Sequence, residues 1–368
     1  MTRALWLGLF LGCVPASVDS TEDDYMNLQP GPESLIGSDG NYNGGWYSDF
    51  DGKINPDDST GSSSAFKGWL HMNLANEDYA ITAHLADLNT AGNAAIALVD
   101  LETGDSWSES TREAFGDNLM QISDDFSSIE NGNDGSFLRV VDGGEVLEFD
   151  IQAHGMHFEG RLQSTGSDRF IQVTRYHDGY GILQWFEQVE VVEATLTLSD
   201  GSCIELPAGM RGTTDRMAGH RRTFQNWNWI AGAGTATRQS DGISVPLALS
   251  MSRDGPEARP QVQAQKYALW VDGNLTKIPS LSFDYTILDP ETRETSDWTI
   301  ASDDGDEDRV DLSFEPTAHR RDHAGYLWFY YTDYNAYLGQ LTGSVTLDGE
   351  VYTLDPMSCI VEDSTLTL

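Results

Sequence analysis

The chain has 368 residues, of which 39% are hydrophobic and 10% aromatic, so a packed fold of two domains is expected rather than disorder. Its 59 acidic residues outnumber the 21 basic ones and give a net charge of −38. This charge excludes nucleic acid as an expected partner, because phosphate backbones bind to basic patches, and it would repel an anionic membrane surface.

The first 24 residues predict an export signal followed by a tether. Arg3 precedes an apolar run, residues 4–12, which is too short to span a bilayer, and Cys13 follows directly. Residues 9–13 (LFLGC) resemble a bacterial lipoprotein cleavage site, at which Cys13 would be lipidated. We therefore expect a cell-envelope or periplasmic protein that meets the membrane only through this anchor, with plain secretion or a misplaced start as alternatives.

From residue 66 onward, short alternating runs separated by tight turns predict β-strands. Strands are expected in the first half at residues 68–74, 79–85, 94–101, 136–141, 145–153, 157–163, 181–192 and 194–198, with one short helix within 105–122. Strands are expected in the second half at residues 226–232, 244–252, 266–271, 281–288, 309–315, 326–331, 340–347 and 350–354.

This pattern predicts an all-β chain of two antiparallel β-barrels or sandwiches with few short helices. Pro207 and two glycines interrupt the pattern near residues 206–212. We therefore expect an N-terminal domain over residues 25–210 and a C-terminal domain over residues 211–368.

Residues 213–234 place proton-moving groups beside aromatic rings. Asp215 and His220 are the candidate catalytic residues, and Arg221 is a candidate for binding an anionic ligand group. An acid that protonates a carbon–carbon double bond must stay protonated near neutral pH, so its pKa must be raised by burial. Arg216, Arg221 and Arg222 would lower the pKa of Asp215 if they pointed toward it, and a structural salt bridge or turn cap is the alternative role.

Two further groups of aromatic residues are candidate ligand contacts. Trp227 and Trp229 are two residues apart, so a strand would place both indoles on one face. The aromatic run over residues 326–337 would place Trp328 and Tyr330 together on one face of another strand. Either pair could line an apolar pocket, where indole faces stabilise a cation by about 1–2 kcal/mol, or pack into a core.

From the remaining cysteines and histidines we expect neither a cofactor nor a bound metal. Cys203 and Cys359 could form one disulfide or remain two buried thiols. His154 and His157 are three apart, with Glu159 beyond them, so strand alternation would separate the two imidazoles. The sequence contains no nucleophile elbow, phosphate loop or dinucleotide fingerprint.

Several segments resemble a bacterial family of unknown function over roughly residues 35–362. They are residues 66–69 (FKGW), 83–88 (AHLADL), 97–104 (ALVDLETG), the block from Asp215 to Trp229, residues 310–316 (VDLSFEP) and 339–343 (GQLTG). That family is similar to a wider group that includes carotenoid hydratases (hydroxyneurosporene synthase), tocopherol cyclases and lipocalin-like cyclases.

The resemblance implies two lipocalin-like β-barrel domains with an apolar pocket at or between the barrel mouths. It also implies that Asp215 is the acid that protonates an alkene and that Trp227 or Trp229 steadies the resulting cation. The hydratase-like pattern has His or Ser after the Asp and then Trp-Gly, whereas residues 215–220 here read DRMAGH.

The functional expectation is a binding protein for a hydrophobic isoprenoid- or lipid-like small molecule. Any activity would be that of a cofactor-free hydratase (a lyase), cyclase or isomerase. A non-catalytic structural envelope protein with filled barrels is the alternative. A cavity reached by Trp227, Trp229 or His220 would favour the first hypothesis, and packed interiors alone would favour the second.

Overall fold

The computed structural model describes residues 25, 27–87, 91–114, 120–131, 135–141, 145–177, 179–221, 224–254, 265–326 and 330–367. The expected leader, tether and Cys13 lie outside these residues. The only named helices in the described part are two 3₁₀ turns, η1 (Pro56–Asp58) and η2 (Ser63–Ala65), and none there has the length and apolarity needed to cross a bilayer. Strands form the rest of the regular structure, so the all-β prediction is confirmed.

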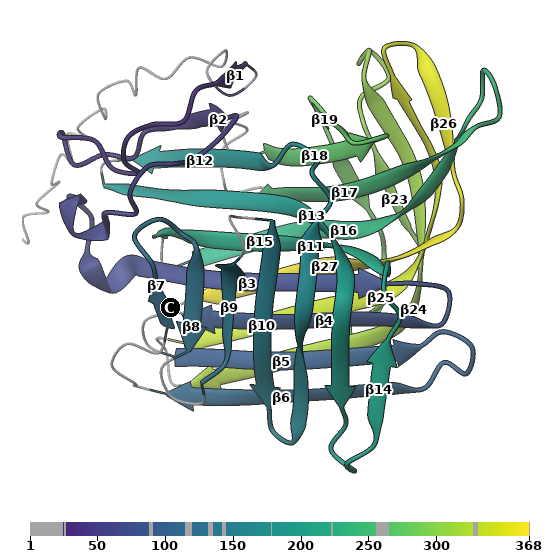
Figure 1. Cartoon of the computed structure of the whole chain (residues 1–368), viewed down its shortest axis with the longest axis horizontal. Helices are drawn as coiled ribbons and strands as arrows, with labels where there is room; N and C mark the ends of the chain where they lie inside the picture. The colour runs from purple at the N-terminus through teal and green to yellow at the C-terminus, as the bar shows by residue number, and fades with distance from the viewer. Residues whose placement is uncertain are drawn as a thin grey trace, which may run out of the picture.

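The first half of the chain forms a curled sheet of 15 strands (Figure 1). Its main path runs through β6 (Ser106–Ala114), β5 (Ala91–Asp100), β4 (Tyr79–Asp87), β3 (Phe66–Ala75), β15 (Arg211–His220), β13 (Tyr180–Thr197), β11 (Met156–Ser164), β10 (Val146–Ala153), β9 (Phe137–Val141), β8 (Ser128–Asn131) and β7 (Met120–Ile122). The branches are β1 (Leu28–Gln29), β2 (Gly45–Tyr47), β12 (Phe170–His177) and β14 (Cys203–Leu206).

The second half forms a curled sheet of 10 strands. They are β19 (Asn274–Lys277), β18 (Gln265–Val271), β17 (Ser244–Asp254), β16 (Phe224–Arg238), β26 (Glu350–Leu354), β25 (Tyr330–Leu347), β24 (Arg309–Tyr326), β23 (Trp298–Ala301), β20 (Ser282–Asp284) and β27 (Met357–Thr367), which pairs with β16 and β25. A small ribbon, β21 (Ile287–Asp289) and β22 (Glu294–Thr295), stands apart from this sheet.

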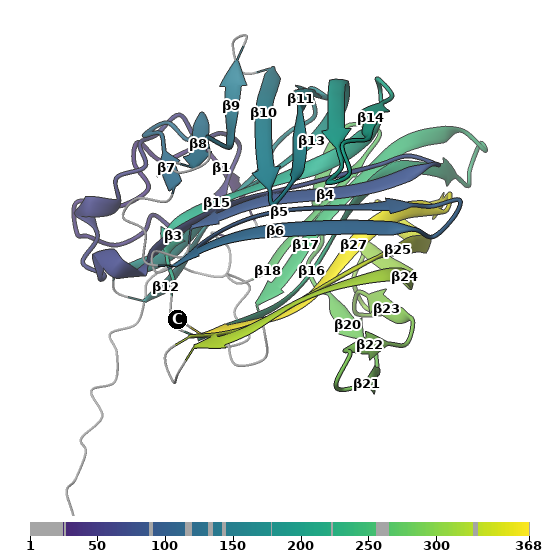
Figure 2. The same cartoon turned by 90° about the horizontal axis from the view of Figure 1, so that it is seen from below.

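The two sheets are half-barrels that lie against each other. Figure 2 shows β3 to β6 of the first sheet extending along β24, β25 and β27 of the second. Each half-barrel has its own apolar core, with Phe149 and Phe158 in the first and Trp298 and Phe314 in the second. A third cluster contains Phe170 and Phe186 from the first sheet and Trp270 from the second, so apolar contacts also join the halves.

Three expectations differ from the observed strands. Within residues 105–122, where a helix was expected, β6 pairs with β5, because an open sheet edge outweighs weak local propensity. The strand expected over residues 326–331 is divided, since β24 ends at Tyr326 and β25 begins at Tyr330 as its antiparallel partner. Finally, β15 pairs with β13 and β3, so residues 211–220 belong to the first sheet rather than the second half, which begins at β16.

A buried ion pair lies on the core side of the first half-barrel. Arg216 donates to Glu187 at 3.1 Å and to the carbonyl oxygen of Phe126 at 3.0 Å, and both charged side chains are 2% exposed. Arg169 also contacts Glu187, at 2.8 Å. Removing one member of such a pair leaves an uncompensated buried charge, which costs more than the intact pair contributes.

We expect Glu187→Gln to lower the free energy of unfolding by about 3–5 kcal/mol, because Arg216 would lose its buried counter-charge. Urea unfolding of the purified protein measures this change. The matched control is Arg139→Gln, which breaks the half-exposed pair with Glu148 and should cost less than about 1 kcal/mol. Equal, small losses in the two variants would contradict this account of the buried pair.

Candidate functional site

A cavity of about 130 Å³ lies between the two half-barrels. The first sheet contributes side chains from β3, β4, β5, β13 and β15, and the second contributes them from β16, β17, β18, β24, β25 and β27. The lining residues that the chemistry uses are Trp69, His71, Asp215, Arg221, Trp227, Trp229, Lys266, Tyr334 and Glu362. The pocket is therefore at the junction, and each half-barrel also has its own apolar core.

Strand alternation decides which side chains reach this cavity. On β3, Trp69 and His71 face the cavity, whereas Met72 and Leu74 belong to the first core. The neighbouring strand β15 places Asp215 directly opposite His71 in the antiparallel register. Arg216, one residue later, points to the core side, where it meets Glu187.

Asp215 is a buried carboxyl with few partners. Its Oδ2 accepts a hydrogen bond of 3.4 Å from Trp69 Nε1, and its Oδ1 has no hydrogen-bond partner among the described residues. Burial raises the pKa of Asp215 to about 7, although the Trp69 hydrogen bond and the charges of Lys266 and Arg221 oppose the rise. At neutral pH this carboxyl is thus close to half protonated.

Of the arginines that closely follow Asp215 in sequence, Arg216 and Arg221 are described, and only the second of these two reaches the cavity. Arg216 is on the opposite face of β15, and Arg222 lies outside the described residues. Arg221 does reach the cavity, where its guanidinium carbon stacks 4.8 Å from the Trp69 ring centroid. Burial is the largest influence on the pKa of Asp215, and the charge of Arg221 offsets only part of the rise.

A second buried carboxyl, Glu362 on β27, faces the same cavity. It accepts hydrogen bonds from Trp227 Nε1 at 2.7 Å and from the Tyr334 hydroxyl at 2.5 Å. Burial raises the pKa of Glu362 to about 7, and the nearby charge of Asp215 adds to the rise. The sequence analysis missed this residue; its signal was an acidic residue directly after the apolar run Ile360-Val361.

His71 is the other functional candidate that the sequence analysis missed. Its Nε2 lies 2.9 Å from Thr82 Oγ1 and 3.8 Å from Glu362 Oε1, and its ring meets the Trp229 indole edge to face at 4.6 Å. Burial, followed by the charge of Arg320, lowers the pKa of His71 to about 3. The imidazole is therefore neutral at physiological pH and can accept a proton only when a strong acid forms beside it.

The structure brings four of the predicted site residues together. Asp215, Arg221, Trp227 and Trp229 all line the cavity, and the two indoles share one face of β16, as their spacing requires. The Trp227 ring also stacks against Trp69 at 6.3 Å, so aromatic groups from both sheets meet there.

The other predicted site residues are elsewhere or are not described. His220 is on the core side of β15, where its Nδ1 lies 2.8 Å from the Tyr42 hydroxyl, and burial lowers its pKa to about 4. Its five-residue spacing from Asp215 places the two on opposite faces of the strand. Trp328 lies outside the described residues, and only the backbone of Tyr330 is described; Thr332 and Tyr334 are the residues of β25 that reach the cavity.

The two cysteines of the described chain are free thiols. Cys203 is exposed on β14 of the first sheet, and Cys359 is buried on β27 of the second. Burial raises the pKa of the Cys359 thiol well above its usual range, so this thiol is unreactive. The disulfide left open by the sequence analysis is therefore not formed.

The chain belongs to the DUF2804 family, a domain of unknown function, whose profile matches residues 27–367. No functionally curated protein matches it. Similar crystal structures include kievitone hydratase from Nectria haematococca, at 15% identity and a TM-score of 0.47, covering 82% of this chain and 88% of that one. Another is a candidate AttH protein from Nitrosomonas europaea, at 13% identity and a TM-score of 0.48, covering 80% and 91%.

The two raised acid pKa values predict how stability depends on pH. At Asp215 and Glu362 the folded chain holds more protons than the unfolded chain between about pH 4 and pH 7, so the contribution of these two groups to the free energy of unfolding falls as pH rises through this window. The lowered pKa values of His71 and His220 act in the opposite direction, so the comparison of variants, rather than the wild-type profile alone, isolates the two carboxyls. We expect Asp215→Asn to flatten part of this fall and to be more stable than the wild type at pH 8 by about 2–4 kcal/mol.

Urea unfolding at pH 4, 6 and 8 measures this dependence, and Glu362→Gln should behave in the same way. Glu77→Gln, which changes an exposed carboxylate, serves as the control and should follow the wild-type profile. A profile of Asp215→Asn that runs parallel to the wild type across the whole range would show that this carboxyl ionises normally.

Proposed function

We propose that this protein binds a small apolar, unsaturated group in the cavity between its half-barrels and protonates it through Asp215. The reaction class is cofactor-free, acid-promoted hydration, isomerisation or cyclisation of an isoprenoid-like molecule. The observation that supports this proposal is a buried carboxyl, with a pKa near 7 and one oxygen without a partner, beside three indoles. The similarity of the block from Asp215 to Trp229 to the carotenoid hydratases points to the same chemistry.

The proton transfer can be written with these residues. The Asp215 carboxyl donates its proton to one alkene carbon, a C–H bond forms, and a carbocation and the Asp215 carboxylate remain. The indole faces of Trp227 and Trp229 stabilise the cation, because their electron-rich faces attract positive charge. Addition of water forms the C–O bond of an alcohol, whereas loss of a proton from the adjacent carbon gives an isomerised alkene.

Glu362 is suited to accept the proton that leaves at the end of this sequence. It faces the same cavity from the opposite sheet, and Trp227 and Tyr334 fix its carboxyl by hydrogen bonds. In its ionised form it would take the proton from the attacking water or from the adjacent carbon. Two carboxyls with pKa values near 7 give one proton donor and one acceptor at neutral pH.

The cavity volume limits what can be enclosed. A water molecule occupies about 30 Å³ in the liquid, and an engineered protein cavity of about 150 Å³ binds benzene. The 130 Å³ between the half-barrels thus fits one ring or one isoprene-sized group. A longer isoprenoid would place its reacting end there and the rest outside.

The competing hypothesis is a structural envelope protein without a ligand. The apolar cores of both half-barrels favour it, because buried side chains of the described residues occupy the space in which a typical ligand-binding barrel holds its ligand. The junction cavity favours the binding hypothesis, since a purely structural junction gains nothing from burying two carboxyls with an incomplete set of hydrogen bonds.

Deuterium incorporation tests the proposed acid directly. Protein in D₂O is incubated with the probes limonene and linalool and with any unsaturated lipid extracted from the protein purified from its native host. Gas chromatography with mass spectrometry then detects new C–D bonds. We expect Asp215→Asn to lower the rate by about 10²-fold or more, and the wild-type rate to fall above pH 7 as Asp215 ionises.

His220→Gln is the matched control, because it removes a titratable group of the same strand that does not line the cavity, and it should keep most of the wild-type rate. Full deuteration by Asp215→Asn would remove the acid role. If no probe is labelled and no unsaturated ligand co-purifies, the structural hypothesis is favoured.

A further inference from the structure

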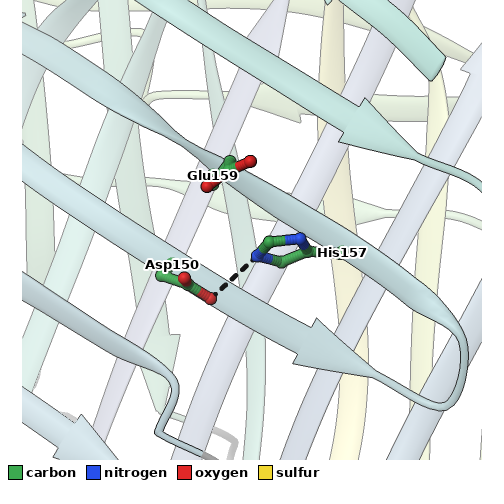
Figure 3. A group of neighbouring side chains, drawn as sticks. All are labelled: Asp150, His157 and Glu159. Atoms are coloured by element: carbon green, nitrogen blue, oxygen red, sulfur yellow. Dashed lines mark hydrogen bonds and ion pairs between the residues drawn. The ribbon is translucent and has the colours of Figure 1, made fainter.

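One imidazole and two carboxylates converge on the outer face of the first half-barrel (Figure 3). His157 and Glu159 are two residues apart on β11, so their side chains lie on the same face. In the antiparallel register, β10 places Asp150 directly opposite Glu159. Phe149 and Ile151, which flank Asp150 on β10, belong to the core, so Asp150 points outward.

The spacing of these donor atoms is close to that of a metal site. One ligand atom from each residue lies within 4.8 Å of the other two, and His157 Nε2 is 3.0 Å from Asp150 Oδ1. Donors around a tetrahedral ion, each at about 2.0–2.1 Å, are about 3.4 Å apart. To complete the set, the exposed side chain of Glu159 must turn inward, and the hydrogen-bonded His157 and Asp150 must separate by a few tenths of an ångström. Two paired strands hold all three backbone positions.

We propose that Asp150, His157 and Glu159 bind a divalent transition-metal ion. A neutral imidazole with two carboxylates balances the charge of such an ion, and this mixed nitrogen and oxygen donor set suits zinc or manganese better than calcium. Three protein ligands leave at least one coordination position for water or for a ligand. None of the three residues lines the cavity between the half-barrels, so this site is independent of the proposed acid chemistry.

His154 is an internal control for this site. It is three residues from His157, in the turn that joins β10 and β11, and its φ of 37° belongs to that turn rather than to a strand. Its imidazole is therefore on the same hairpin but is not part of the ligand group. A metal that merely binds exposed histidines would not distinguish between the two.

The test is isothermal titration of the chelator-treated, full-length protein with zinc chloride. Excess magnesium chloride occupies the weak carboxylate sites that a net charge of −38 creates. We expect one zinc ion per chain, an affinity at least about tenfold lower in His157→Ala and in Glu159→Gln, and unchanged binding in His154→Ala. Because both ligand variants change exposed or half-exposed side chains, thermal unfolding without metal should match the wild type.

Histidine ring ¹⁵N NMR gives a second readout. The Nε2 resonance of His157 is identified by its absence from the spectrum of His157→Ala. Zinc should shift this resonance and leave the His154 resonance in place. The proposal is overturned if zinc does not bind in a one-to-one ratio, if His157→Ala and His154→Ala bind it equally, or if the shifted resonance belongs to another histidine.

Discussion

The packing of the two half-barrels against each other buries two carboxyls that neither sheet alone would bury. Asp215 comes from the first sheet and Glu362 from the second, and both have raised pKa values because the opposing sheet removes water from them. Burying an ionised carboxyl without full compensation is unfavourable, so packing of the sheets and proton uptake are linked. The apolar cluster that joins the halves and contains Phe186 and Trp270 therefore also helps to raise the pKa of these carboxyls.

The period of two residues in a β-strand explains most of what could be predicted from the sequence. It placed Trp227 and Trp229 on one face, and the strands expected over residues 68–74 and 79–85 are the antiparallel pair β3 and β4. The same period, applied to the spacing of Asp215 from Arg216 and His220, would have placed those two residues on the other face.

The rest depended on contacts between distant parts of the chain. Sequence periodicity does not say which sheet faces which, so neither Glu362 nor His71 could be assigned to the same cavity as Asp215. The strand β6 was mistaken for part of a helix because its stability comes from pairing with β5 rather than from its own residues. Likewise, β15 follows an interrupted segment and still completes the first sheet, between β13 and β3.

The cationic side chains in the cavity, Lys266 and Arg221, stabilise the carboxylate of Asp215 but do not prevent its protonation. Lys266 and Arg221 lower the pKa of Asp215, yet burial outweighs them, so a large fraction of the carboxyl is protonated at neutral pH. After transfer, the Asp215 carboxylate is the species that these charges stabilise, while the indoles stabilise the cation formed on the bound molecule. Lys266 and Arg221 therefore interact weakly with the neutral Asp215 carboxyl and strongly with the carboxylate that forms as the proton leaves. Stabilising the developing carboxylate more than the neutral acid lowers the barrier to proton transfer.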